Sequence, residues 1–321
     1  MSKINYRSEI VFLYDIKDAN PNGDPLDENK PRIDEETGIN IVTDVRLKRT
    51  IRDYLMNFNK EEIFVREIID DKGKIQDAKL RAKDFLCNVE NLEKKGFNDQ
   101  KDVIKNKIIN SCIDVRLFGA TIPLDLTIKE GKTSKNVTGS ITLTGPVQFK
   151  MGRSMHRVEI KHIKGTGAFA SKPGTTQKTF REEDILSYSL ICFYGIINEN
   201  AANHTHLTEK DVNLLLEGIW NGTKNLISRS KVGQVPRLLI KVNYKEKNYH
   251  IGDLDKRIKI SSDKSDEQIR DISELKFDIS ELVSLFNDNK NKIENIDLKV
   301  NERIKIDFDK LKIPVREIKI D

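Results

Sequence analysis

Lysine and arginine residues gather in three short segments of the chain, and their side chains suit the binding of phosphate groups. Residues 43–52 carry a net charge of +3, residues 145–181 carry +7 and residues 221–241 carry +5, which leaves −10 for the rest. The whole chain has a formal net charge of only +5. Charge that is segregated in this way favours a surface that binds a polyanion. The alternative is that the charges scatter over a broad solvated surface.

The first basic segment is expected to be a helix that Thr43 caps and that ends near residue 58, because apolar residues recur in it at helical spacing. Lys48 and Arg52 are four residues apart and share one face, whereas Arg46 and Arg49 form a neighbouring row. Basic side chains in the early turns of a helix suit a phosphate group. The alternative is an ordinary solvated helix face, although few acids lie nearby in the sequence to pair with these cations.

The second basic segment is rich in glycine and threonine and poor in core residues, which indicates a long loop or a hairpin that projects from the fold. Met151, Met155 and Phe169 lie there among basic residues. Basic side chains can hold a nucleic-acid backbone while apolar side chains wedge against the bases. The alternative is a hairpin whose apolar side chains pack on its own domain.

The third basic segment contains Ser228, Arg229, Ser230 and Lys231, followed by a turn with a glycine. Hydroxyl and cationic groups can bind phosphate, and the backbone N–H groups of such a turn can add to them. The segment can also be the basic end of a helix that complements the helix dipole. Both interpretations can hold together.

Acidic residues crowd the loop after the first predicted strand, and they are the main hint of an enzyme. They are Asp15, Asp18, Asp24, Asp27 and Asp34. Such carboxylates can bind Mg²⁺ or activate water in a nuclease. The dense turn-forming residues around them favour solvated loop acids instead. No P-loop is present, and His204 and His206 lack further ligands in register. We therefore expect no catalytic residue, no metal site and no cofactor.

The elements that must position these segments follow the order strand, helix, strand, insertion, strand, helix, strand. Strands are expected near residues 9–16, 62–69, 139–145, 186–197 and 235–244, and helices near residues 43–58 and from residue 208. This order predicts an α+β fold with a ferredoxin-like β-α-β-β-α-β core. Most of residues 75–112 is expected to be helical.

The chain has 321 residues, of which 37% are hydrophobic, so it can bury a large core. No apolar run approaches the ~20 residues that span a bilayer, and the first residues lack the apolar core of a signal peptide. Cys87, Cys112 and Cys192 lie far apart, which is typical of reduced thiols in a cytosolic protein. We therefore expect a cytoplasmic protein without a membrane partner.

A single elaborated domain is expected, because the sequence shows no internal repeat and no low-complexity linker. Its core would lie within residues 1–245, with a helical insertion at about 70–140 and the projecting hairpin at about 150–181. Residues 246–321 would be a C-terminal elaboration packed on the same domain.

An ordered set of motifs carries a resemblance to a known family. The motifs lie at residues 7–25, 31–34, 42–53, 114–119, 145–149 and 228–239, and the fourth reads Asp114-Val-Arg-Leu-Phe-Gly119. The chain resembles the backbone subunit of type I CRISPR Cascade, which is the Cas seven family of the RAMP superfamily. It is most similar to the I-B branch, with the I-C branch close. The match spans roughly residues 5–245.

The resemblance implies a ferredoxin-like, RNA-recognition-type domain with large insertions, arranged as a palm, fingers and a thumb hairpin. Such subunits polymerise along CRISPR RNA into a helical filament, and each grips the sugar-phosphate backbone without reading the sequence. The bases stay free to pair with target DNA, and this pairing supplies the specificity. The implied partners are CRISPR RNA, target DNA, further copies of the chain, and the crRNA-processing endonuclease, large subunit and small subunits of Cascade, all in the cytoplasm of a prokaryote.

The resemblance places Thr43, Lys48 and Arg52 on the family's phosphate-contacting helix, with Arg46 and Arg49 as weaker candidates. The thumb is expected within residues 150–181. Its candidates for the wedge beside a displaced nucleotide are Met151, Met155 and Phe169. The side chains that would flank the wedge are Arg153, His156 and Arg157. Further contacts to the RNA backbone are expected from Ser228, Arg229 and Lys231.

Two other functions stay open on the sequence alone. Related backbone subunits of type III complexes use a loop aspartate and a divalent metal to cut target RNA, so the chain could be an endonuclease with Asp24 or Asp34 in that role. A stand-alone RNA-binding module would bind long RNA as a monomer. The motifs favour a non-catalytic, sequence-independent scaffold for the guide RNA.

Overall fold

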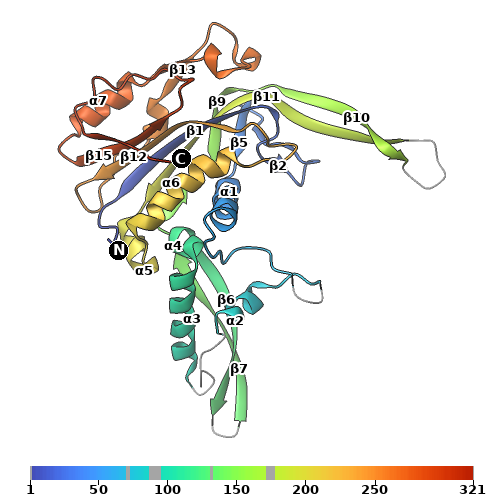
Figure 1. Ribbon diagram of the computed structural model, residues 1–321, viewed down its shortest axis with the longest axis vertical. Coiled ribbons are helices and arrows are strands. Elements are labelled where there is room, and N and C mark those ends of the chain that lie inside the picture. Colours follow the sequence, from blue (N-terminus) through green and yellow to red (C-terminus); the bar gives the residue numbers. More distant parts are fainter. Residues whose placement is uncertain (1, 70–72, 87–94, 131–132, 171–177, 321) are drawn as a thin grey trace.

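The computed structural model describes residues 2–69, 73–86, 95–130, 133–170 and 178–320, without the side chains of residues 130, 166–170 and 178–181. These residues form a mixed α+β fold around one large sheet, from which a lobe and a hairpin extend in different directions (Figure 1). Within this part of the chain, no helix is long and apolar enough to cross a bilayer.

The helices are α1 (Asp44–Asn57), α2 (Ala78–Asp84), α3 (Phe97–Ser111), α4 (Ile113–Phe118), α5 (Glu199–Thr205), α6 (Glu209–Lys224) and α7 (Ser280–Asp288). The strands of the large sheet are β1 (Ser8–Ala19), β4 (Ile33–Asp34), β5 (Ile39–Val42), β8 (Val147–Phe149), β9 (Gly152–Arg157), β10 (Ile160–Ala170), β11 (Lys178–Ile197), β12 (Val235–Tyr244), β15 (Ile293–Val300) and β16 (Val315–Glu317). The two-stranded pairs are β2 (Gly23–Asp24) with β3 (Lys30–Pro31), β6 (Gly119–Glu130) with β7 (Thr133–Thr144), and β13 (Lys259–Ser261) with β14 (Lys276–Asp278).

Strand β1 lies in the middle of the large sheet and pairs antiparallel with β11 on one side and β12 on the other. The strand order is β16-β15-β12-β1-β11-β9-β5-β4, and β8 and β10 also pair with β11. Both faces of β1 are buried, as its nearly continuous apolar sequence predicts. Phe12 and Tyr14 belong to the core on one face, whereas Val11 and Leu13 belong to the core on the other.

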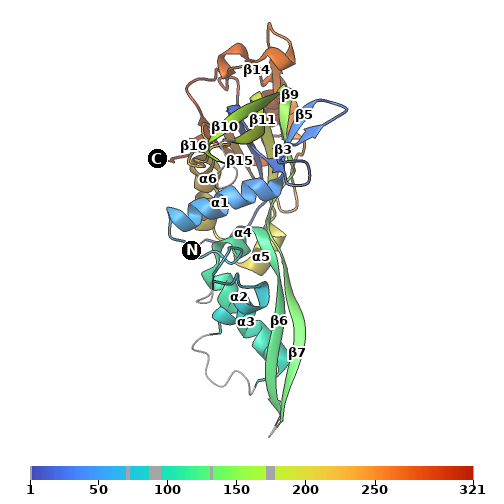
Figure 2. The ribbon, with the colours of Figure 1, turned by 90° about the vertical axis from the view of Figure 1, so that its right-hand side faces the viewer.

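Helices α1 and α6 cover one face of the sheet and pack against each other (Figures 1 and 2). The apolar stripe predicted for the first helix is buried, with Leu47, Ile51 and Leu55 in the core. The two helices approach closely at Gly218, where a Cβ atom would lie 3.0 Å from Cγ2 of Ile51. The absence of a side chain at Gly218 therefore sets the distance between α1 and α6.

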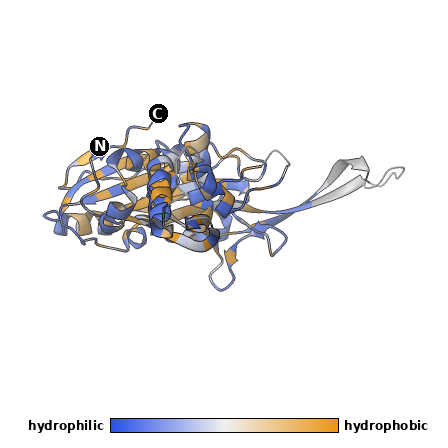
Figure 3. Ribbon diagram, turned by 90° about the horizontal axis from the view of Figure 1, so that it is seen from below, coloured by the Kyte–Doolittle hydropathy of each residue, from blue (hydrophilic) through white to orange (hydrophobic). Residues whose placement is uncertain are grey.

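Residues from the C-terminal part of the chain cover the opposite face of the sheet (orange and red in Figure 1). Leu254, Ile272, Leu282 and Phe286 are fully or almost fully buried there, beside Ile240 of β12. The C-terminal residues thus complete the second core of the same sheet. Figure 3 shows that hydrophobic residues gather in the body of the molecule, whereas the described part of the hairpin is mainly hydrophilic.

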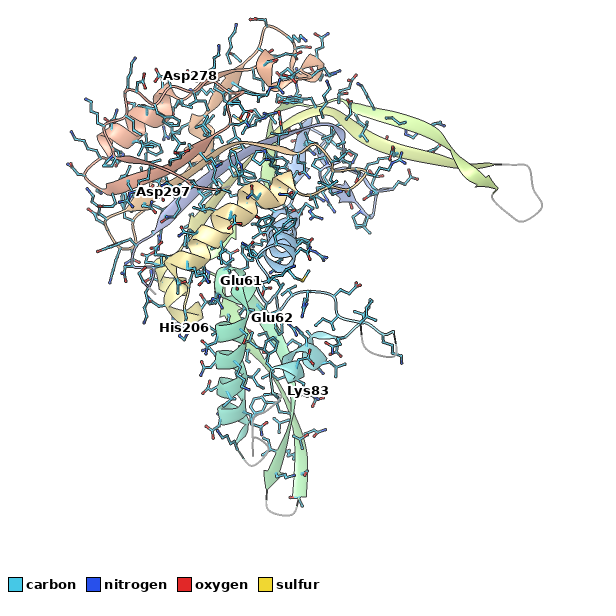
Figure 4. All side chains as sticks on the ribbon, in the orientation of Figure 1. Glu61, Glu62, Lys83, His206, Asp278 and Asp297 are labelled. Carbon is cyan, nitrogen blue, oxygen red and sulfur yellow. The ribbon has the colours of Figure 1, made fainter. Side chains whose placement is uncertain are left out.

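A lobe built from α2, α3, β6 and β7 extends from the body (Figures 1 and 2). It has its own core, with Ile104 and Ile108 of α3 packed against Ile122 and Leu124 of β6. Glu62 lies where α1 meets this lobe (Figure 4), and it accepts hydrogen bonds from Arg66 and Arg81. The lobe is therefore a separate packing unit that must be held to the body at its base.

A buried aspartate holds the lobe to the body. Asp114 of α4 is fully buried, and its carboxylate accepts the backbone N–H groups of Phe64 at 2.8 Å and of Val65 at 3.1 Å. It also accepts a hydrogen bond from Nε of Arg52, which lies on α1, at 3.0 Å. Three donors compensate for the burial of the carboxylate and tie α1, the chain after it and α4 together.

Helix α4 also binds α6. Arg116 donates to both carboxylate oxygens of Asp211 at 2.8 and 3.1 Å, and to the carbonyl of Ile109 at 3.0 Å. Asp211 is itself part of a capping box with Thr208 at the start of α6, which confirms the predicted helix start. The motif at residues 114–119 is thus the joint between the lobe and the two helices of the body.

The structure corrects two of the predicted strands. Residues 62–69 form only isolated bridges, Glu62 with Cys112 and Ile69 with Ile75, because Asp114 takes backbone N–H groups of this stretch that a strand would need. Residues 139–145 belong largely to β7, which pairs with β6 in the lobe and lies outside the large sheet. Strands β8 and β9 pair with β11 in their place.

We expect Asp114→Asn to lower the free energy of unfolding by about 3 kcal/mol, because it leaves the mostly buried Arg52 cation without its charged partner. Chemical unfolding followed by circular dichroism would measure this. Asp53→Asn is the matched control, since Asp53 pairs with the exposed Arg49 one turn away, and it should cost about 0.5 kcal/mol or less. Equal effects of the two substitutions would show that Asp114 does not hold the joint.

Candidate nucleic-acid interface

Three segments that are distant in the sequence meet at the end of β1. Ala19 pairs with Leu186 at the root of the hairpin, and Asp15 pairs with Val235 at the start of β12. Asn20, which directly follows the last residue of β1, donates its backbone N–H to the carbonyl of Ser230 at 2.8 Å. The first strand therefore brings the second and third basic segments of the sequence to one place.

The first basic segment arrives at the same place through the start of α1. Thr43 caps the helix, as predicted, by accepting the backbone N–H of Arg46 at 3.2 Å. The backbone N–H and hydroxyl of Thr43 both donate to Oδ1 of Asn22, at 2.9 and 2.8 Å. Because Asn22 lies in the loop after β1, this contact fixes the first turn of α1 against the end of β1.

Arg46 is a partly buried cation in the first turns of α1. Its guanidinium donates to Oγ1 of Thr50 at 3.0 Å, while its Nε is buried and has no hydrogen-bond partner among the described residues. Burial lowers the pKa of Arg46, which means that its surroundings compensate poorly for its charge. An anion placed beside Arg46 would supply the missing compensation.

Lys231 is a second partly buried cation close to the first. Its ammonium group donates to the carbonyl of Asn20 at 3.2 Å and to Oγ of Ser230 at 3.3 Å. Burial lowers the pKa of Lys231, and the positive charge of Arg46 lowers it further. Within the described part of the chain, neither cation has a carboxylate within ion-pair distance. Two neighbouring cations without an acid form a site that a phosphate group can neutralise.

The other basic residues of α1 are already paired. Lys48 binds Asp44 at 2.9 Å and Oε1 of Gln148 at 3.1 Å, and Arg49 binds Asp53 at 2.8 Å. The expectation that this helix face carries unpaired charge is therefore wrong for these two residues. Asp44 lies four positions before Lys48, and Asp53 lies four positions after Arg49. This spacing on a helix allows both ion pairs to form.

Arg52 is also engaged inside the molecule, because it binds Asp114 at 3.0 Å. Its guanidinium carbon and the Lys48 ammonium lie 5.1 and 5.7 Å from the centre of the Phe118 ring. The sequence hides this arrangement because Asp114 lies 62 positions after Arg52. Arg52 and Lys48 thus stabilise the joint of the lobe, and Arg46 is the cation of α1 that has no ion pair among the described residues.

The described wedge candidates differ in exposure. Met151 is 54% exposed beside β9, whereas Met155 packs against the second core of the sheet. Phe169 lies in the part of β10 whose side chains fall outside the described residues. The flanking Arg153 pairs with Asp34 at 3.1 Å, and Arg157 pairs with Glu267 at 3.2 Å. Both arginines are more than half exposed, so their ion pairs are weak and exchangeable.

His156 lies in the interior, which does not fit its expected place beside a guide RNA. Its Nδ1 lies 2.8 Å from the carbonyl of Arg157, and its Nε2 lies 3.3 Å from the backbone nitrogen of Leu190. A neutral ring that carries its proton on Nδ1 satisfies both groups. The ring also stacks on Tyr188, with centroids 5.6 Å apart. Burial lowers the pKa of His156, which keeps the ring neutral.

The loop at residues 228–231 forms a tight turn, in which the carbonyl of Ser228 accepts the backbone N–H groups of Lys231 and Val232. Ser228 is exposed. Arg229 is 63% exposed and pairs with Glu183 of β11 at 2.8 Å. The loop therefore contributes one partly buried cation, Lys231, and one exposed cation to the end of β1.

The acidic loop is held by ion pairs with basic residues. Asp24 binds Arg32 at 2.8 Å and accepts the backbone N–H of Leu26, and Asp34 binds Arg153. Asp15 is buried at 3.0 Å from Arg237 and accepts the hydroxyl of Tyr188 at 2.9 Å. In the part of the chain that the structure describes, no three His, Cys, Asp or Glu residues gather into a metal-binding group.

The neutral His156 ring predicts a pH dependence of stability. Its folded-state pKa is lowered, so below the unfolded-state value of about 6.5 the unfolded chain takes up a proton that the folded chain does not. The free energy of unfolding should fall by up to about 1.4 kcal/mol per pH unit below that point and stay intact above it.

Chemical unfolding between pH 7.5 and 5.5 tests this, with His156→Gln as the control that keeps an acceptor near Nε2 but cannot titrate. The neighbouring charges of Asp266, Arg157 and Arg270 remain in both proteins. The variant should lose the pH-dependent part of the stability. Identical pH profiles would contradict the buried neutral ring.

Comparisons with known proteins agree on one family. Residues 6–280 match the family described as CRISPR-associated protein Cas7. A Haloferax volcanii protein described as CRISPR-associated protein Cas7 is 33% identical over 316 residues, which cover 96% of this chain and 90% of the relative.

Two solved structures share the fold at 11% sequence identity. A chain of a "CRISPR RNA-guided surveillance complex, pre-nicking" matches with a TM-score of 0.55, over 97% of this chain and 96% of that chain. A chain of a "CRISPR RNA-guided surveillance complex" matches with a TM-score of 0.50, over 97% and 94%. With the family match over most of its length and the 33% identical relative, the chain belongs to the CRISPR-associated protein Cas7 family.

Proposed function

We propose that this chain is the backbone subunit of a CRISPR RNA-guided surveillance complex and binds the guide RNA through its sugar-phosphate backbone. Membership of the Cas7 family supports the assignment. The observation that carries the binding mode is the pair of partly buried cations, Arg46 and Lys231, at the end of β1: Nε of Arg46 is buried without a hydrogen-bond partner among the described residues, and Lys231 binds only neutral oxygens there. Burial lowers the pKa of both cations, and Asp53 offsets this for Arg46 only in part, so a phosphate group would supply the missing compensation.

This chemistry recognises a backbone and does not read bases. Cationic groups bind the phosphate of any nucleotide equally well, so the guide sequence is free to vary. The exposed Arg153, Arg157 and Arg229 can exchange their weak protein pairs for further phosphates. Pairing between the guide and target DNA then supplies the specificity of the complex.

The fold supports a finer assignment. The strand order β12-β1-β11, continued by β8 and β9, with α1 and α6 on one face, supports the assignment of a ferredoxin-like core. We assign this core to a palm, the lobe of α2, α3, β6 and β7 to the fingers, and the hairpin of β10 and β11 to the thumb. Residues 246–321 would be the elaboration that covers the second face of the palm.

The proposed partners are those that a backbone role requires. Further copies of the chain would succeed one another along the guide, and the other Cascade subunits would cap the ends of the filament and process the guide. We assign no catalytic residue; of the two candidates, Asp24 is held at 2.8 Å by Arg32, which would compete with a metal ion. We place the complex in the cytoplasm of a prokaryote.

The cation pair can be tested with glutamine substitutions that keep the length and polarity of the side chains. We expect Arg46→Gln and Lys231→Gln each to weaken binding of single-stranded RNA of any sequence by about tenfold, the usual loss for one charged hydrogen bond. Each should also reduce the slope of log affinity against log salt concentration by about 0.7. Fluorescence anisotropy at about 50 to 200 mM salt would measure the affinity and its dependence on salt.

Arg49→Gln is the matched control on the same helix, since Arg49 already pairs with Asp53. Its loss of RNA affinity should be clearly smaller than that of Arg46→Gln or Lys231→Gln, because Arg49 must give up its pair with Asp53 to bind a phosphate. The stability of Arg46→Gln and Lys231→Gln should be unchanged or higher, because each removes a poorly compensated cation. An effect confined to particular RNA sequences, or equal losses in all three variants, would contradict the proposed site.

A further inference from the structure

The hairpin leaves the large sheet at a β-bulge. Ser154 of β9 pairs with Ile191, and Ile160 of β10 pairs with Leu186, so six positions on one strand face five positions on β11. The extra residue lies within residues 155–159. A bulge bends its strand and changes the direction of the chain beyond it. Beyond this bulge, β10 and the paired part of β11 project from the body of the molecule (Figure 1).

The side chain of His156 fills the gap that the bulge leaves in the ladder. Its Nε2 accepts the backbone N–H of Leu190, which has no ladder partner on the bulged strand, and its Nδ1 donates to the carbonyl of Arg157. The hydroxyl of Ser154 donates to the carbonyl of His156 at 2.7 Å. Both sides of the bulge thus keep their hydrogen bonds in one geometry only.

The C-terminal residues grip the same bulge from outside. Asp266 accepts the backbone N–H of Arg157 at 3.0 Å, and Glu267 lies 3.2 Å from the Arg157 side chain. Arg270 donates to the carboxylate of Glu159 and to the carbonyls of Glu267 and Ile269. A single guanidinium therefore joins the turn of the C-terminal residues to the root of the hairpin.

Glu159 connects Arg270 to β11, the opposite strand of the hairpin. Its carboxylate accepts the hydroxyl of Ser187 at 2.8 Å, and its carbonyl accepts the backbone N–H of Ser187 at 3.0 Å. Ser187 lies on β11, directly beside the first pair of the hairpin, Ile160 with Leu186. Arg270 is therefore linked through Glu159 to both strands of the hairpin at the point where they leave the sheet.

The gripping residues are themselves firmly held. Ile269 and Ile272 are buried in the second core of the sheet, and the backbone N–H of Arg270 donates to Glu274 at 2.8 Å. Exposed ion pairs contribute little to stability singly. Here, several such contacts reach the bulged stretch at residues 155–159 from one anchored turn, so they act together on the root of the hairpin.

We propose that the turn at residues 265–274 orients the projecting hairpin, with Arg270, Glu159 and His156 as positioning residues. The consequence for RNA rests on the proposed function: a hairpin held in one direction would meet the guide at the same place in every protomer. This gives the C-terminal residues a role in guide binding without a contact to the guide. Loss of the grip would widen the range of hairpin directions while leaving the body of the protein folded.

Hydrogen-exchange mass spectrometry of the full chain without RNA tests the grip directly. We expect Arg270→Glu to speed amide exchange about tenfold in residues 158–165 and 182–188, with residues 8–16 of β1 unchanged. Glu159→Gln, a milder change, should act in the same direction. The double exchange Glu159→Arg with Arg270→Glu restores opposite charges and should restore slow exchange at the root.

The same proteins, bound to guide RNA and treated with a nuclease, should differ in the regularity of the protected pattern. We expect a blurred pattern for Arg270→Glu and a regular one for the double exchange. Unchanged exchange at the root in Arg270→Glu, or equally faster exchange in β1, would overturn the inference. A grip confirmed without RNA, together with no regular protection in the parent protein, would instead contradict the proposed function.

Discussion

The pairing of β1 with both β11 and β12 is the interaction on which the rest of the structure depends. Its register sets Ala19 beside Leu186 and Asp15 beside Val235, so the hairpin root and the loop before β12 meet at the end of one strand. The loop after β1 then fixes the start of α1 through Asn22. One strand thereby assembles a cationic site from three segments that the sequence keeps far apart.

Charge compensation decides which of the many cations remain available. Most basic residues near the site bind a carboxylate, as Lys48 and Arg52 do, and their first role is to hold α1 and the lobe together. Arg46 and Lys231 differ because folding partly buries both of them, and neither has a carboxylate within ion-pair distance among the described residues. A protein tolerates such an arrangement where a ligand supplies the opposite charge, and under the proposed function a guide phosphate is that ligand.

Local patterns in the sequence predict α1, α6 and β12 well, because capping residues and apolar periodicity act over a few positions. The same patterns fail for residues 62–69, where Asp114 takes the backbone N–H groups from about 50 positions away. They also place His156 at the RNA, although its ring is buried, where it accepts a hydrogen bond from the backbone of Leu190 and stacks on Tyr188. The sequence also hides the ion pair of Arg52, because its partner Asp114 lies 62 positions later in the chain. The sequence identifies the basic segments and the family, while long-range contacts decide which side chains stay free.

Electron cryo-microscopy of the chain assembled on its guide RNA tests the central claim most directly. The account predicts a phosphate within hydrogen-bond distance of both Arg46 and Lys231 in successive protomers, whatever base that nucleotide carries. It would be contradicted by a guide that runs over another surface of the protomer and leaves both cations without contact to RNA.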